Sequence, residues 1–154
     1  MKIYLVRHGD AVPAASDRAD AHRHLSARGR STCRGVGRLL RETGVTFDAV
    51  LTSPLVRAVQ TAELLAEAVG YLGVIEAHVG LLPGAQPEVI AAELLARDGA
   101  VAAFGHEPTI SALAAYLSGR PAFASFLPGQ VCYLESRAPV WKLHPEVLQL
   151  QDLH

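Results

Sequence analysis

Three short apolar runs, each followed by a turn and then by a helical pattern, constrain this chain more than any other feature. The runs cover residues 3–6, 48–52 and 101–104. Short apolar runs bounded by turn residues are typical of buried strands, whereas apolar residues spaced three or four apart are typical of a helix that covers a sheet. The alternation predicts an α/β fold, a three-layer α/β/α sandwich whose central sheet is mostly parallel.

Capping residues indicate where the predicted helices begin and end. Ser26 is the expected N-cap of the first helix, and Gly44 is its expected stop. The second helix is expected to start at Pro54 and to close at Gly70. The other expected elements are a weaker strand around 74–79, a helix from 87, a helix over 110–119, and strands over 131–134 and 140–143. The last two strands predict an antiparallel hairpin at one sheet edge, and the tail from Pro145 is poorly defined.

Length and composition limit the classes of protein that remain. A chain of 154 residues with 50% hydrophobic residues can bury one core, so we expect residues 1–154 to form a single domain. The net charge of -1 provides no general attraction to nucleic acid or to an anionic membrane. No apolar run approaches the roughly 20 residues of a membrane span, and the N-terminal apolar stretch is too short for a secretory signal. We expect a soluble, cytoplasmic protein that binds neither nucleic acid nor membrane.

Cysteine and histidine spacing does not encode a metal or redox centre. Cys33 and Cys132 lie far apart and have no CxxC neighbour, which predicts buried thiols in a reducing compartment. His22 and His24 form a His-x-His pair that could ligate zinc or nickel, but no third or fourth ligand is arranged around it. We therefore expect no bound metal and no cofactor.

Arginine and histidine side chains follow the ends of the three predicted strands. Arg7 and His8 come directly after the first strand. Arg57 lies in the first turn of the helix after the second strand, and His106 follows the third strand. Because the carboxyl ends of parallel strands meet at one edge of a sheet, we expect these side chains to lie together. Two arginine forks match a dianionic phosphoryl group better than a carboxylate, so this edge is a predicted phosphate site.

The two histidines can divide the chemistry of phosphoryl transfer between them. A neutral imidazole is a nucleophile toward phosphorus, and His8 is the predicted nucleophile because neighbouring cations favour its neutral form. His106 is expected to be protonated and to donate to the equatorial oxygens of the transferring group. Charge spreads over those oxygens in the transition state, so positioning and electrostatics can accelerate the reaction without a metal.

Three motifs occur in order along the chain: Arg7-His8-Gly9, Ser53-Pro54-x-x-Arg57-Ala58-x-Gln60-Thr61 and Gly105-His106-Glu107-Pro108. Together they resemble the histidine phosphatase (phosphoglycerate mutase-like) superfamily. Three further segments are similar to the SixA-type phosphohistidine phosphatases and extend the resemblance over nearly the whole chain: Arg7-His8-Gly9-Asp10-Ala11, Arg23-x-Leu25-Ser26-x-x-Gly29 and Trp141-x-Leu143-x-Pro145-x-x-Leu148. The resemblance implies a phosphoglycerate mutase-like fold, with residues 1–154 as a single histidine phosphatase domain.

The resemblance also implies roles for the residues of these motifs. It implies a covalent phosphohistidine intermediate on His8. The implied phosphate-binding set is Arg7, Gly9, Arg57 and His106.

One departure from the family pattern bears on the substrate. Mutases and many sugar-phosphate phosphatases of the superfamily carry a general acid in the segment that is 81–86 here, and this segment contains no carboxylate. An alkoxide leaving group needs a proton, whereas the nitrogen of a phosphoramidate leaves more readily. The departure favours hydrolysis of phosphohistidine on a protein, such as a phosphotransfer domain. Glu107 is a possible proton donor, although a solvated carboxylate at a helix N-terminus explains it as well.

Two other functions remain open on the sequence. One is a broad small-molecule phosphomonoesterase that uses the same nucleophile, and the other is a non-catalytic phosphohistidine-binding module. Binding alone would need the cations but not His8. A monomer is expected, because no interface stripe is apparent. The loop over 10–24 and the arginine-rich first helix are either docking surfaces for a partner or ordinary solvated surface.

Overall fold

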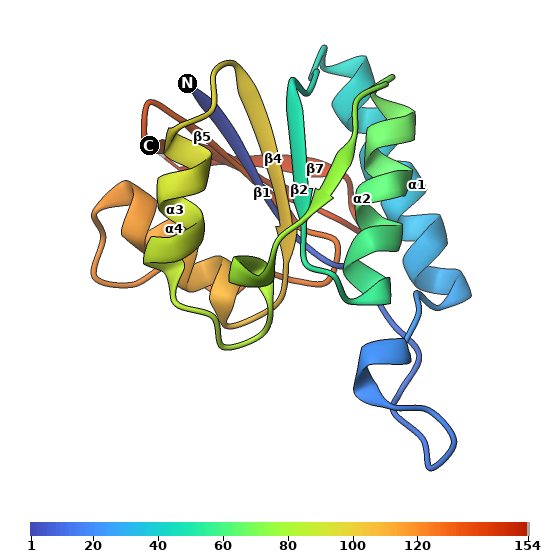
Figure 1. The fold of residues 1–154 in the computed structure, drawn as a ribbon. Coiled ribbons are helices and arrows are strands. Elements are labelled where there is room, and N and C mark those ends of the chain that lie inside the picture. Colours follow the sequence, from blue (N-terminus) through green and yellow to red (C-terminus); the bar gives the residue numbers. More distant parts are fainter. Residues whose placement is uncertain (154) are drawn as a thin grey trace.

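The computed structural model describes residues 1–153. Within them the strands form one sheet in the order β3-β2-β4-β1-β5-β6-β7 (Figure 1). The elements in chain order are β1 (Lys2–Arg7), η1 (Asp20–His22), α1 (Ala27–Glu42), β2 (Ala49–Thr52), α2 (Val56–Ala68), β3 (Ile75–Ala77), η2 (Val79–Leu81), α3 (Pro87–Leu95), β4 (Ala100–Gly105), α4 (Thr109–Ser118), β5 (Val131–Glu135), β6 (Ala138–His144) and β7 (Gln149–Asp152). The two η segments are single 3₁₀ turns.

The sheet combines a parallel half with an antiparallel edge, which confirms the predicted fold class. β3, β2, β4 and β1 pair in parallel, and β5, β6 and β7 pair in antiparallel fashion beyond β1. The edge is one strand larger than the predicted hairpin. β7 is polar and exposed along its whole length, so it carries no period-two pattern, and only its ladder with β6 orders it.

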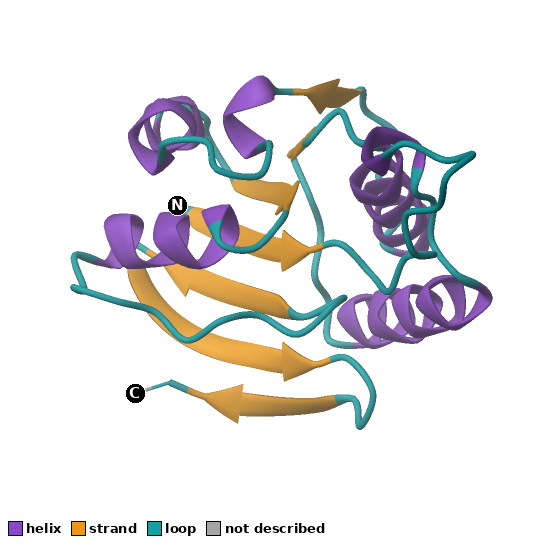
Figure 2. Ribbon diagram, turned by 90° about the horizontal axis from the view of Figure 1, so that it is seen from below, coloured by secondary structure: helices purple, strands orange, loops and turns teal. Residues whose placement is uncertain are grey.

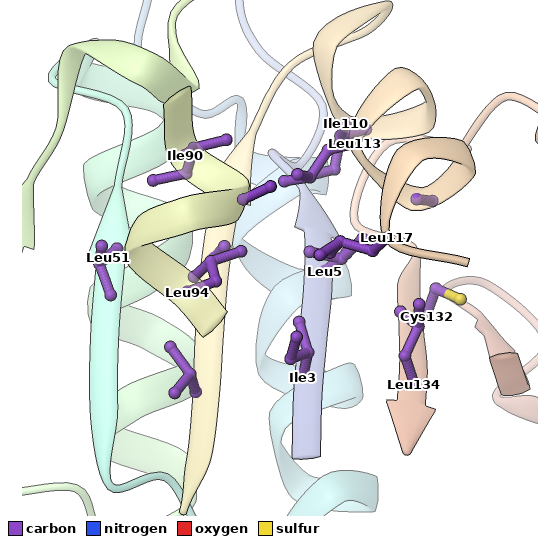
Figure 3. Packing of buried hydrophobic residues seen from close by; sticks show 14 of the residues in the cluster. Ile3, Leu5, Leu51, Ile90, Leu94, Ile110, Leu113, Leu117, Cys132 and Leu134 are labelled. Carbon is purple, nitrogen blue, oxygen red and sulfur yellow. The ribbon is translucent and has the colours of Figure 1, made fainter. Parts of the chain in front are cut away.

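Helices cover both faces of the sheet (Figure 2). Alternate residues of β1 point to opposite faces. Ile3 and Leu5 pack in the core cluster formed with α3 and α4 (Figure 3), whereas Tyr4 and Val6 pack in the cluster formed with α1 and α2. Removing these side chains from water is the main driving force for the layered arrangement, at about 1.5–3 kcal/mol for each large aliphatic side chain.

The two cysteines lie on opposite faces of the sheet. Cys33 belongs to the cluster under α1 and α2, and Cys132 to the cluster under α3 and α4. Both are free thiols and buried, as predicted. No helix among residues 1–153 combines the length and the apolar character needed to cross a lipid bilayer.

The predicted ends of the first helix are confirmed, and the start of the second is shifted. Ser26 Oγ accepts a hydrogen bond from Gly29 N at 3.0 Å, which caps α1. Gly44 follows α1 with a φ of 77°, a conformation that glycine adopts without strain. α2 begins at Val56 rather than Pro54, because Ser53 Oγ accepts from Leu55 N at 3.3 Å and keeps these residues in a turn.

Candidate active site

The predicted phosphate-site residues are brought to one edge of the sheet, where the parallel strands end. Arg7 is the last residue of β1 and lies opposite Gly105, the last residue of β4. The backbone N–H of His8 donates to Gly105 O at 3.0 Å. The rings of His8 and His106 are 5.0 Å apart between centroids, and their side chains are almost fully buried. In Figure 1 this edge is the lower one, from which the blue loop after β1 descends.

The hydrogen bond of His8 determines which of its nitrogens can attack. His8 Nδ1 lies 2.7 Å from Gly9 O. A carbonyl oxygen can only accept, so Nδ1 carries the ring proton. In the neutral ring the lone pair is then on Nε2. The carbonyl of Gly9 therefore selects the tautomer of His8 that a nucleophilic role requires.

His106 is held in the complementary tautomer by Ser53. Its Nε2 lies 2.8 Å from Ser53 Oγ. Ser53 Oγ accepts from Leu55 N at 3.3 Å, and its own proton can be donated to His106 Nε2. When the hydroxyl donates in this way, the ring proton of a neutral His106 is on Nδ1, which makes Nδ1 a donor.

Burial favours the uncharged form of both imidazoles, and the protonated His106 expected from the sequence stays a prediction for the phosphoryl complex. Burial and the charges of Arg57, Arg7 and Arg23 lower the pKa of His8 to about 4, against the opposing hydrogen bond to Gly9 O. Burial, repulsion from His8 when that ring is also protonated, and the charge of Arg57 lower the pKa of His106 to about 3. At neutral pH burial and the neighbouring arginines therefore favour a neutral His8, the form that a nucleophilic role requires, and a neutral His106.

The two arginines are anchored by part of their guanidinium groups. Arg7 Nη1 donates to Phe126 O at 2.7 Å. Arg57 Nη1 donates to Asp20 O at 2.9 Å, and its Nη2 lies 3.3 Å from Asp20 Oδ2. Among the described residues, three buried side-chain nitrogen or oxygen atoms have no hydrogen-bond partner, and all belong to this site: Arg7 Nε, Arg57 Nε and His106 Nδ1.

Thr61 ties the nucleophile loop to α2. Its Oγ1 accepts from Gly9 N at 3.0 Å and donates to Arg57 O at 2.8 Å, and the side chain is fully buried. The structure therefore gives Gly9 a backbone role in holding His8. A Cβ at Gly9 would lie 2.7 Å from Cys33 Sγ, so a larger residue would push this loop away. Thr61 belongs to the second sequence motif, but its link to Gly9 could not be inferred from spacing.

The loop over 10–24 lies against the site, and it contributes a residue that sequence reasoning missed. Asp20 in η1 contacts Arg57 as described, and its Oδ1 pairs with Arg23 at 3.1 Å. Arg23 and Arg57 hold the pKa of the Asp20 carboxyl below its usual range. No local pattern marks Asp20, because its role depends on how the loop folds over α2.

The His-x-His pair of this loop does not gather further ligands. His24 Nδ1 lies 3.0 Å from Leu25 O, and His22 is exposed. In residues 1–153 no group of three or more His, Cys, Asp or Glu side chains is placed to hold a metal ion.

Glu107 has both carboxylate oxygens engaged. Oε1 accepts from Phe126 N at 3.0 Å and Oε2 accepts from Ser111 Oγ at 2.7 Å. Its role as a proton donor stays a prediction. These contacts also give it a structural role, because they join the residue after His106 to the segment that holds Arg7.

Comparisons with known proteins point to one family. The model of the histidine phosphatase superfamily (branch 1) matches residues 3–94. The solved structure of the protein histidine phosphatase SixA complexed with tungstate is similar, with a TM-score of 0.88 and 25% identity over 97% of this chain and 100% of that chain.

Two curated relatives match a shorter part of the chain. An uncharacterized protein of Picosynechococcus sp. is 43% identical over 44% of this chain and 41% of its own length. The mitochondrial serine/threonine-protein phosphatase Pgam5 of Drosophila grimshawi is 39% identical over 45% of this chain and 23% of its own length. The match thus spans less than half of each relative. Because the family model covers more than half of this chain and the site has the expected geometry, the chain belongs to the histidine phosphatase superfamily, with a fold of the SixA type.

Proposed function

We propose that this protein is a phosphatase that hydrolyses phosphohistidine on a protein through a covalent phosphohistidine intermediate on His8. The observation that carries the proposal is the set of unpartnered buried nitrogens on Arg7, Arg57 and His106, at the sheet edge where the rings of His8 and His106 lie 5.0 Å apart. Buried polar atoms without partners are rare in folded proteins. Two arginines and a neutral histidine donor from three strand ends suit the oxygens of one phosphoryl group.

The reaction has two displacements at phosphorus. In the first, His8 Nε2 attacks, the bond between phosphorus and the substrate nitrogen breaks, and its electron pair returns to the leaving imidazole, which takes a proton from solvent. In the second, water attacks, the bond between phosphorus and Nε2 breaks, and inorganic phosphate leaves as the water gives up a proton. Gly9 O accepts from His8 Nδ1 throughout and stabilises the ring while Nε2 carries phosphorus.

The carboxylates near the site support a phosphoramidate substrate. Segment 81–86 has none, and both oxygens of Glu76 are bound to Arg97 at 2.8 Å. Asp20 is held ionised by Arg23 and Arg57, so it is a poor donor of a proton. A leaving nitrogen needs such a donor less than an alkoxide does. This is the reason to prefer phosphohistidine over a broad small-molecule phosphomonoesterase.

The setting of the reaction follows from the substrate. We infer that a phosphotransfer domain of a signalling relay supplies the phosphohistidine and that the enzyme acts as a metal-independent monomer in the cytoplasm. Two buried thiols on opposite sides of the sheet suit a reducing compartment. The arrangement of cations supports catalysis without a metal. Activity that a chelator abolishes and a divalent cation restores would contradict this part of the proposal.

The test is a time course of phosphate release from a histidine-phosphorylated phosphotransfer domain and from simple phosphate monoesters. Wild type should prefer the phosphoprotein, and His8→Ala should lose the activity and form no phosphoenzyme in a rapid-quench experiment. His22→Ala, at an exposed histidine of the 10–24 loop, is the matched control and should behave as wild type. A preference for monoesters would assign the general phosphatase function, and turnover that survives in His8→Ala would refute the covalent mechanism.

A further inference from the structure

Lys142 on β6 is a buried cation. Its side chain is 5% exposed, and within residues 1–153 no carboxylate lies at ion-pair distance from it. Burial lowers its pKa. A lysine ammonium is strongly hydrated, so taking it out of water is unfavourable unless other contacts compensate.

The hydrogen bond and the cation–π contacts of this ammonium come from the segment over 120–130, which links α4 to β5 and forms neither helix nor strand. The charge of Glu107, which lies outside this segment, also favours the protonated lysine. Lys142 Nζ donates to Ala124 O at 2.9 Å. The same Nζ lies 4.0 Å from the ring centroid of Phe126 and 4.9 Å from that of Phe123, which are cation–π distances. Lys142 pairs across the ladder with Cys132, so its side chain points to the face of the sheet on which this segment packs. One lysine therefore fastens an irregular segment to the sheet.

The segment is open on one side. A cavity of 380 Å³ is lined by Ala122, Ala124 and Ser125 of this segment together with Lys142 and Leu153. Along this open side Lys142 supplies restraints that packing does not, through its hydrogen bond to Ala124 O and its cation–π contacts.

Phe126 connects this anchor to the active site. Its carbonyl oxygen accepts from Arg7 Nη1 at 2.7 Å, and its N–H donates to Glu107 Oε1 at 3.0 Å. Arg7 Nε, in the same guanidinium, is one of the unpartnered nitrogens of the phosphate site. The direction in which Arg7 presents its planar fork thus depends on where the Phe126 carbonyl lies.

We propose that Lys142 is a positioning residue, which holds the 120–130 segment so that Phe126 orients Arg7 toward the phosphoryl group. The inference rests on the proposed phosphate-binding role of Arg7. A displacement of about 1 Å in a positioning group can cost on the order of a hundredfold in rate, and a loosened rather than lost anchor should cost on the order of tenfold.

Steady-state kinetics and inhibition by inorganic phosphate test the proposal. Lys142→Met keeps the length of the side chain and removes its charge and donor, so kcat/KM should fall and the inhibition constant of phosphate should rise, each on the order of tenfold. Lys142→Arg keeps a cation and donors and should restore most of both. Arg120→Gln is the matched control, because Arg120 is an exposed cation of the same segment whose guanidinium contacts the Phe123 ring, at 5.8 Å, and not Phe126, and it should leave both constants unchanged.

A double-mutant cycle with Arg7→Ala separates positioning from a general loss of structure. Lys142→Met should raise the phosphate inhibition constant in the wild-type background and have no further effect once Arg7 is absent. Phe126→Leu, which keeps the backbone carbonyl but removes the ring under the ammonium, should reproduce the effect if Lys142→Met does not fold. An unchanged inhibition constant in both variants, or the same rise in the Arg7→Ala background, would overturn the inference. If Arg7→Ala itself binds phosphate as well as wild type, the proposed phosphate site fails and this inference fails with it.

Discussion

Lowering the pH from 7 to 5 should destabilise this protein through His8. Burial and the charges of Arg57, Arg7 and Arg23 lower the pKa of His8 to about 4 in the folded chain. In the unfolded chain a histidine has a pKa of about 6.5. Between these two values the unfolded chain takes up a proton that the folded protein excludes. The contribution of the neutral His8 to the free energy of unfolding is therefore fully present above about pH 6.5 and is lost progressively as the pH falls toward 4.

The size of the loss follows from the two pKa values. Proton linkage for one group with these values gives about 2 kcal/mol between pH 7 and pH 5. His8 is 9% exposed, so solvent screening leaves most of this effect. His106 has a pKa of about 3 and acts in the same direction, so the wild-type loss should be larger than the share of His8.

Urea unfolding followed by circular dichroism at pH 7, 6 and 5 isolates the share of His8. His8→Gln should lose about 2 kcal/mol less than wild type between pH 7 and pH 5, whatever its stability at pH 7. His22→Gln removes an exposed histidine and should keep the wild-type pH dependence. If His8→Gln and wild type lose the same free energy of unfolding, burial does not depress the pKa of His8. The electrostatic account of the neutral nucleophile would then be wrong.

Two further substitutions test contacts around the phosphate site. Thr61→Val should cost about 1–3 kcal/mol in urea unfolding, because Gly9 N–H is left buried without its acceptor. Thr61→Ser keeps the hydroxyl and should cost clearly less, and equal losses would show that the hydrogen bond is not responsible. Asp20→Asn should lower the inhibition constant of inorganic phosphate by up to about fivefold, which is the range of an exposed ion pair. The reason is that the Asp20 carboxylate repels a bound anion and also pairs with Arg57. Weaker inhibition would show instead that the charge of Asp20 is needed to hold Arg57.

Local patterns were sufficient to predict the scaffold and the members of the site. The apolar runs that became β1, β2 and β4 are buried in a parallel sheet, and parallel strands end at a common edge. For that reason His8, Arg57 and His106 could be grouped although they are far apart in the chain. η1, η2 and β7 escaped prediction, because they are short and lack a buried periodic face.

The amino-acid sequence by itself therefore determined which residues meet at the candidate site and how the layers are arranged, since both depend on periodicity and on the ends of strands. Only the tertiary structure decided the burial that lowers the pKa of His106, the pairing of Asp20 with Arg57, and the contacts of Phe126 with Arg7 and Lys142. Each of these depends on burial or on a contact between irregular segments distant in the chain. Such contacts depend on how the loops pack against the folded sheet, and residue spacing in the sequence does not predict them.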